Sequence, residues 1–163
     1  MIKLLKDVYG TVIICVLITL YLIQPHSGFL LIFVIPILII WFIYCAYLIY
    51  TKPDVRKLIL IRMSIWFFAV SAVIGVHTYY HQITRQAADS IVSAIEDYRT
   101  KTGEYPENLK IIGISHRELE EQIGMAGYAN DADGPLLFYS TTYMPFAKYR
   151  YYFQSRNWIY DGD

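Results

Sequence analysis

The sequence predicts an α+β membrane protein with three transmembrane helices, the third continuous with a long amphipathic helix that packs on a small antiparallel sheet. Three observations support this fold class. Hydrophobic residues make up 56% of the 163 residues, most of the apolar residues precede residue 80, and the last 30 or so residues alternate aromatic with polar side chains. We therefore expect a transmembrane anchor over residues 1–80 and an extracytoplasmic head over residues 81–163.

The apolar residues of the anchor form three runs, at about residues 8–23, 29–50 and 58–80. The second and third runs contain 22 and 23 residues, which at about 1.5 Å per residue is enough to cross a hydrocarbon core of roughly 30 Å. The first run has 16 residues and a charged start, as a signal peptide would. No cleavage site of the A-x-A type follows it, so we expect this run to be a retained span.

The distribution of lysine and arginine predicts the orientation, because short cytoplasmic loops are enriched in both. Six basic residues precede the first run or surround the start of the third: Lys3, Lys6, Lys52, Arg56, Lys57 and Arg62. The connection "QPHSG" between the first two runs contains none. We therefore expect a protein of the bacterial inner membrane, with a cytoplasmic N-terminus and with the chain after Tyr80 outside the cytoplasm.

A single helix is predicted from Leu58 to about Thr102. Residues 76–102 contain no glycine or proline, and apolar residues recur there at helical spacing: Ile83, Ala87, Ile91, Ala94, Ile95 and Tyr98. Gly103 is the residue type expected just past a helix end, and Pro106 prevents continuation of the helix. The apolar stripe beyond the membrane requires a layer that covers it.

The remaining head sequence supplies that layer. The segment "SHRELEEQIG" has Ser115 and Glu118 at the spacing of a capping box and predicts a short helix that stops at Gly124. Strands are predicted near residues 136–141, 147–154 and 158–160, the last two joined by a tight turn at 155–157. Tyr149, Tyr151 and Phe153 are expected to face the long helix.

The stretch "AADSIVSAIEDYRTKTGEYPENL" resembles the type IV pilins and the type II secretion pseudopilins, in which a similar pattern follows the membrane half of a long helix. The matching residues are Ala87, Ala88, Ile91, Ala94, Tyr98, Gly103, Tyr105, Pro106 and Leu109. The resemblance implies a pilin-like head over roughly residues 58–163. It also implies a processing site that contains a glutamate. The most similar segment of this sequence is "GFLLIF", which has Phe33 in place of that glutamate. We therefore expect a pilin-like head that does not assemble into a filament.

The charge and the cysteines limit the possible partners and cofactors. Residues 81–163 contain 12 acidic and 8 basic side chains, a balance that suits a basic protein and disfavours nucleic acid. Cys15 and Cys45 both lie in predicted spans, so the head has no thiol for a disulfide or a thiolate metal site. We expect no cofactor.

The candidate partner-binding residues lie in the tyrosine-rich C-terminal part of the head: Lys148, Arg150, Tyr152, Trp158 and Tyr160. Asp131 and Asp133 offer carboxylate oxygens to a calcium ion, although a polar turn before a strand also accounts for them. His77 and His81 are one helical turn apart. This spacing would allow them to bind a metal ion together, but it is also typical of polar residues placed at the lipid boundary. We find no nucleotide-binding, metalloprotease or serine-hydrolase motif and do not expect an enzyme.

These observations favour a non-catalytic inner-membrane protein whose head binds a protein partner. The specific form that we expect is an immunity protein that neutralises a toxin acting in the envelope or the membrane, and a basic toxin would suit the acidic head. The alternative is a structural accessory of a type II secretion or type IV pilus-like machine. A third hypothesis is an envelope enzyme that uses His77, His81 and the aspartates.

Overall fold

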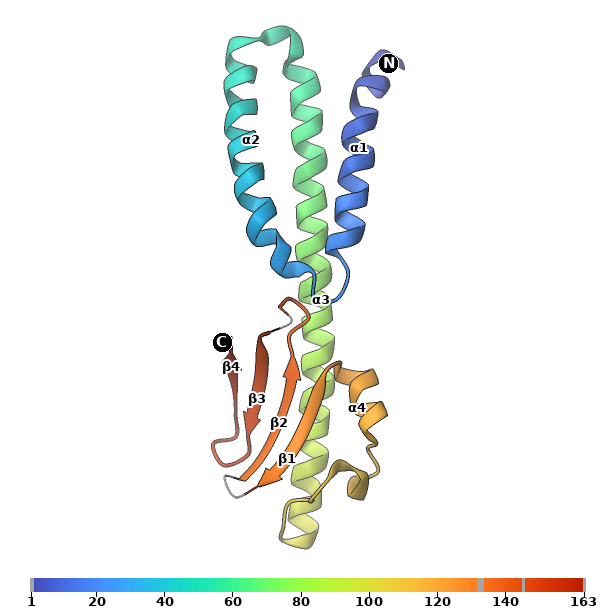
Figure 1. Ribbon diagram of the computed structural model, residues 1–163, viewed down its shortest axis with the longest axis vertical. Helices are drawn as coiled ribbons and strands as arrows, with labels where there is room; N and C mark the ends of the chain where they lie inside the picture. The colour runs from blue at the N-terminus through green and yellow to red at the C-terminus, as the bar shows by residue number, and fades with distance from the viewer. Residues whose placement is uncertain (1, 132–133, 145, 163) are drawn as a thin grey trace. The chain divides into compact units, whose positions relative to one another are not determined.

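The computed structural model describes residues 2–131, 134–144 and 146–162 (Figure 1). Contacts divide the chain into two compact units, unit 1 over Met1–Thr78 and unit 2 over Tyr79–Asp163. The main elements are α1 (Ile2–Leu22), α2 (Leu31–Thr51), α3 (Arg56–Thr102), α4 (His116–Ile123), β1 (Ala126–Asp131), β2 (Gly134–Ser140), β3 (Lys148–Tyr152) and β4 (Asn157–Asp161). Short 3-10 helices occupy Gly28–Leu30, Pro53–Val55 and Leu109–Ile112. The boundary between the units falls within α3.

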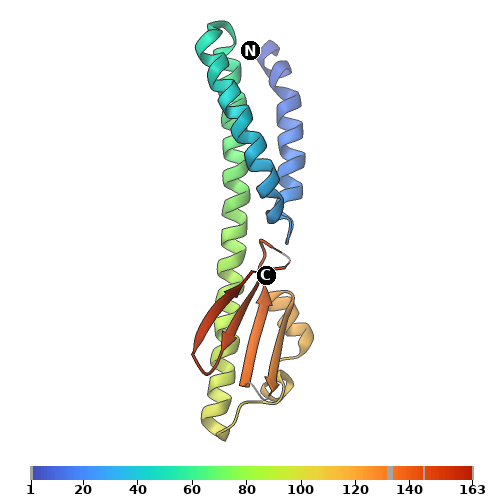
Figure 2. The same ribbon diagram turned by 60° about the vertical axis from the view of Figure 1, so that its left-hand side comes forward.

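Unit 1 consists of α1, α2 and the first part of α3, which lie side by side (Figures 1 and 2). The Ser27 hydroxyl, in the α1–α2 connection, donates to backbone carbonyl oxygens at the end of α1, including that of Leu22 at 2.8 Å. Nε2 of the buried His77 lies 2.8 Å from the same Leu22 oxygen. These polar groups join the α1–α2 connection to α3 inside unit 1.

Among the residues that the structure describes, two helical segments are long and apolar enough to cross a membrane, Gly28–Thr51 and Pro53–Thr102. They contain the second and third apolar runs of the sequence. The apolar stretch of α1, Val8–Leu22, is shorter. The crossing of a membrane by three spans therefore stays a prediction, whereas the mixed α and β architecture is confirmed.

Unit 2 is a four-stranded antiparallel sheet in the order β1-β2-β3-β4, with the last part of α3 on one side of it (Figures 1 and 2). The core joins residues from every layer: Ala88, Ile91, Val92, Ile95, Leu109, Leu119, Ile123, Ala126, Leu137, Tyr139 and Phe153. The packing of a sheet on the stripe of the long helix is thus confirmed. Tyr149 and Tyr151 also pack against this core, as expected.

The predicted end of α3 and both predicted ends of α4 are correct, whereas α3 begins at Arg56, two residues before the predicted Leu58. Thr102 ends α3, and Gly103 follows it with φ of 86°, a left-handed conformation that costs glycine little. Ser115 and Glu118 form both hydrogen bonds of the capping box at the start of α4, and Gly124 follows its end. The local sequence signals were sufficient here because each cap involves residues close together in the chain.

The predicted stripe on α3 is wrong at one end. Ile83 is 43% exposed, whereas Ala88 and Val92, which the stripe omitted, are buried. The buried set Ala88, Ile91, Val92 and Ile95 still has helical spacing, but it lies toward a slightly different side of the helix. The sheet covers that side.

The sequence prediction omitted β1 entirely. This strand, "AGYAND", contains no β-branched residue and includes a glycine, so strand propensity is low. Its pairing with β2 over the whole register from Ala126↔Tyr139 to Asp131↔Gly134 supplies the missing stabilisation. The other three strands lie close to their predicted positions, and the β3–β4 turn occupies residues 153–156, with Phe153 in it.

Candidate partner-binding face

The sheet of unit 2 has a helix-facing side and an outer face. Directly paired residues in antiparallel strands lie on the same side, and sides alternate along each strand. The pairing assigns these residues of β2, β3 and β4 to the outer face: Leu136, Phe138, Lys148, Arg150, Tyr152, Ile159 and Asp161. The opposite side carries Leu137, Tyr139, Tyr149, Tyr151, Trp158 and Tyr160.

The outer face combines exposed apolar side chains with anchored charges. Lys148 Nζ lies 5.3 Å from the centre of the Phe138 ring, a cation–π arrangement. Arg150 forms an ion pair with Asp161 on the neighbouring strand. Tyr152 and Ile159 are exposed on the same face. Phe138, Arg150 and Tyr152 are of residue types that are enriched at protein interfaces.

Three of the five predicted partner-binding residues, Lys148, Arg150 and Tyr152, lie on the outer face. Trp158 does not, because its strand register pairs it with Tyr151 on the helix-facing side. Tyr160 likewise pairs with a residue of that side, although its position on the edge strand leaves it exposed. The predicted set therefore does not form one surface.

Trp158 is held by two residues of α3. Its indole Nε1 donates a hydrogen bond to Asp89 Oδ1 at 2.8 Å, and the Arg85 guanidinium lies 4.5 Å from the centre of the ring. Arg85 and Asp89, four residues apart on α3, also form an ion pair. This arrangement fixes β4 to α3, so the contacts of Trp158 are accounted for within unit 2.

The neighbouring His81 is part of the same side of α3. Its ring lies 5.3 Å from that of Tyr149. Burial lowers the pKa of His81, and the nearby Arg85 charge lowers it further. The imidazole therefore favours its neutral form, which suits packing against an aromatic ring.

Sequence reasoning missed Phe138, Leu136 and Ile159 as outer-face residues. Large apolar side chains in a strand are usually taken for core residues, and only the pairing partners reveal the face. The alternation of Leu136 and Phe138 with the buried Leu137 and Tyr139 was the available signal.

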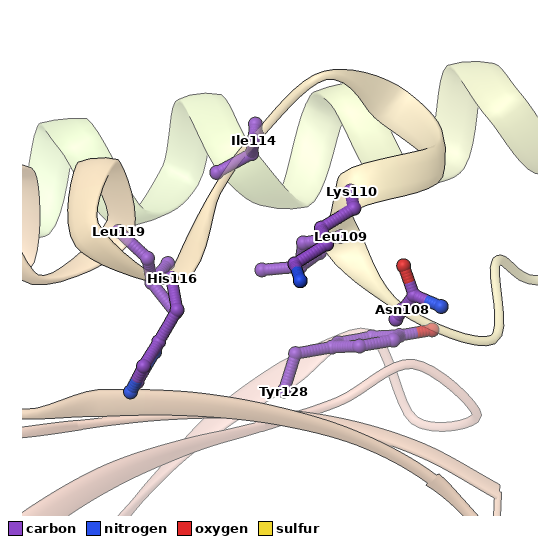
Figure 3. Close-up of a pocket in the computed structure, with 7 residues that line it drawn as sticks. All are labelled: Asn108, Leu109, Lys110, Ile114, His116, Leu119 and Tyr128. Carbon is purple, nitrogen blue, oxygen red and sulfur yellow. The ribbon is translucent and has the colours of Figure 1, made fainter.

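A groove of about 340 Å³ lies between β1 and the segment that leads into α4 (Figure 3). Apolar and polar side chains line it together: Asn108, Leu109, Lys110, Ile114, His116, Leu119 and Tyr128. The Tyr128 hydroxyl donates to the Pro106 carbonyl oxygen at 2.9 Å. His116 lies 3.6 Å from Glu120, its neighbour one turn on. These contacts stabilise the segment, and they do not assemble a nucleophile with a base.

The Tyr128 hydroxyl should make the unfolding free energy of unit 2 sensitive to alkaline pH. Burial raises the pKa of its hydroxyl from 10.0 to about 12. Because the folded-state pKa lies above the unfolded one, the stabilising contribution is complete below pH 10 and is lost as the pH rises toward about 12. We expect Tyr128→Phe to reduce the decline in unfolding free energy across this range, measured by urea titration at a series of pH values. An equally steep decline in both proteins would contradict the assignment.

No metal site is evident among the described residues. Within residues 2–131, 134–144 and 146–162, no group of three or more His, Cys, Asp or Glu side chains is placed to hold a metal ion. Asp133 lies outside the described residues, and of Asp131 only the backbone, at the end of β1, is described. The calcium hypothesis therefore stays a prediction from the sequence. His77 and His81 contact different partners, Leu22 and Tyr149 respectively.

Unit 2 is an α+β unit with one exposed sheet face. The helix α3 joins it to a unit that contains apolar helices of membrane length. Comparisons with protein-family models, with curated proteins and with solved structures found no match.

Proposed function

We propose that unit 2 is a binding module for a protein partner and that the outer face of its sheet makes the contact. One observation supports this most directly. Phe138, Tyr152 and Ile159 present apolar area on a face that has no covering layer among the described residues, beside the charges of Lys148 and Arg150. Tyrosine and arginine are the residue types that most often dominate the binding energy of protein interfaces.

The charges of unit 2 suggest how a partner is recognised. Its sequence carries 12 acidic and 8 basic side chains, so its overall field attracts a basic protein during encounter. The outer face itself carries two cations, Lys148 and Arg150, and the carboxylate of Asp161. We expect a partner that is basic overall and offers aromatic or acidic groups at the contact.

The proposed location is the outer side of a bacterial inner membrane, with unit 2 anchored through the apolar helices. An immunity protein against an envelope toxin is the specific function that we propose. A role in a secretion or pilus-like machine would instead use the surface of α3, as the resemblance to pilins implies. The two functions therefore predict different contact surfaces.

The test is affinity capture with the full chain from detergent-solubilised membranes, followed by mass spectrometry and affinity measurement with the captured protein. We expect Tyr152→Ala to weaken binding by about 2 kcal/mol, roughly 30-fold, as truncation of an interface anchor does. Tyr160→Ala is the matched control, because Tyr160 is an exposed tyrosine on the opposite side of the sheet.

The control also decides between contact surfaces. Equal binding by Tyr152→Ala, Arg150→Ala and the unmodified chain would exclude the outer face. Loss of binding in Tyr160→Ala alone would place the contact on the helix-facing side of the sheet. A captured toxin whose activity the chain suppresses would support the immunity function, and a secretion-machine component would support the alternative.

A further inference from the structure

One end of unit 2 exposes a group of large apolar side chains that the outer face does not include. Phe146, in the β2–β3 connection, is 77% exposed, and Met125, just before β1, is 52% exposed. Tyr79, Tyr80 and Ile83, at the start of the unit 2 part of α3, are also exposed. We call these five residues the interfacial end.

Contacts within unit 2 place the β2–β3 connection at the end where the unit begins. The His81 ring contacts Tyr149, and Asp89 accepts a hydrogen bond from Trp158, which pairs with Tyr151. As α3 advances from His81 to Asp89, β3 therefore advances in the same direction. The chain before Tyr149, which includes Phe146, accordingly extends back toward Tyr79.

Met125 belongs to the same end. Its carbonyl oxygen accepts a hydrogen bond from the Ser140 amide at 2.8 Å, and Ser140 pairs with Lys148 at the start of β3. The ribbon shows this arrangement within unit 2: the β2–β3 connection and the start of β1 lie toward the first residues of the unit (Figures 1 and 2). The exposed apolar residues thus come from three separate segments.

The sequence at this end has the composition of a membrane boundary. Tyr79 and Tyr80 close the apolar run of residues 58–80, and the described part of the β2–β3 connection contains Tyr143, Met144 and Phe146 without a carboxylate. Lys148 follows directly. Aromatic residues collect at the headgroup level of a bilayer, where a lysine extends its charge to water.

We propose that the interfacial end docks into the headgroup region of the bilayer that residues 58–80 cross, with Phe146 inserted toward the acyl chains. A lipid surface is the occupant because the chain enters unit 2 from an apolar run of membrane length at this same end. The inference rests on the proposed membrane crossing and is independent of partner binding. In this proposal the exposed Phe146 contacts lipid, whereas the exposed Tyr152 contacts a protein partner.

The test places a spin label at one position at a time in the full chain, reconstituted into phosphatidylcholine–phosphatidylglycerol nanodiscs. The labelled variants are Phe146→Cys, Tyr79→Cys as the boundary reference and Ile111→Cys as an exposed isoleucine outside the interfacial end. The unmodified chain, in which Cys15 and Cys45 are buried, gives the background. Collision rates with oxygen, which concentrates in lipid, and with a water-soluble nickel chelate give the depth of each label.

We expect the oxygen-to-nickel collision ratio at Phe146 to approach that at Tyr79 and to exceed that at Ile111 several-fold. A ratio at Phe146 equal to that at Ile111, with a lipid-like ratio at Tyr79, would overturn the docking of this end. Water-like ratios at both Phe146 and Tyr79 would overturn the membrane crossing itself, and the inference with it. Neither result would bear on the binding of a partner by the outer face.

Discussion

Replacement of Ile95 by alanine is expected to lower the free energy of unfolding of unit 2 by about 2–5 kcal/mol. Ile95 is fully buried in the core where α3 meets the sheet and α4. The substitution removes buried methyl and methylene groups and leaves a cavity that close-packed neighbours fill only in part. Hydrogen exchange of the β2 amides, in the full chain in detergent, measures the opening of this unit.

The matched control is Ile83→Ala, the same substitution three turns earlier on the same helix. Because Ile83 is 43% exposed, its truncation should change the free energy of opening by no more than about 0.5 kcal/mol. The pair therefore tests which side of α3 the sheet covers. Equal effects of the two substitutions would contradict the observed stripe.

Phe153→Ala is expected to have a comparable or larger effect, about 3–5 kcal/mol. The Phe153 ring is 1% exposed and contacts the rings of Tyr105, Tyr128 and Tyr151 at centroid distances of 5.3, 6.3 and 4.8 Å. It therefore links the segment after α3 to β1 and β3. We expect its loss to accelerate exchange in both strands, and thermal denaturation in detergent should show a lower midpoint.

The preceding residue provides the control for this prediction. Tyr152 is 37% exposed on the outer face, so Tyr152→Ala should leave the unfolding free energy within about 0.5 kcal/mol of its original value. A large loss of stability in Tyr152→Ala, or none in Phe153→Ala, would contradict the assignment of Tyr152 to the outer face and of Phe153 to the core. The same measurement verifies that the Tyr152 binding variant is folded.

Much of the fold could be predicted because its signals are local. The apolar run and the absence of glycine and proline from residues 76–102 predicted α3, and the capping box at Ser115 predicted α4. The ion pairs Arg85–Asp89 and Glu96–Arg99 likewise join residues three or four positions apart on α3. Each of these features depends on residues within one or two turns of helix.

The parts that could not be predicted depend on long-range pairing. The weak intrinsic strand propensity of β1 is offset by its partner β2, which no local pattern specifies. Trp158 was assigned to the binding surface because the register that pairs it with Tyr151 was unknown. A shift of one residue in register exchanges the two sides of a strand, so the composition of the outer face could not be derived from alternation alone.

The pairing of Gly127 with Phe138 constrains how this sequence can diverge. A Cβ atom at residue 127 would lie 2.6 Å from the Phe138 ring, so the ring occupies the space that any other side chain would need. A change at residue 127 in a related protein should therefore be accompanied by a smaller residue at 138. Such a pair of changes would also remove the aromatic ring beside Lys148. The two positions are thus expected to covary, and with them the charge environment of the proposed contact face.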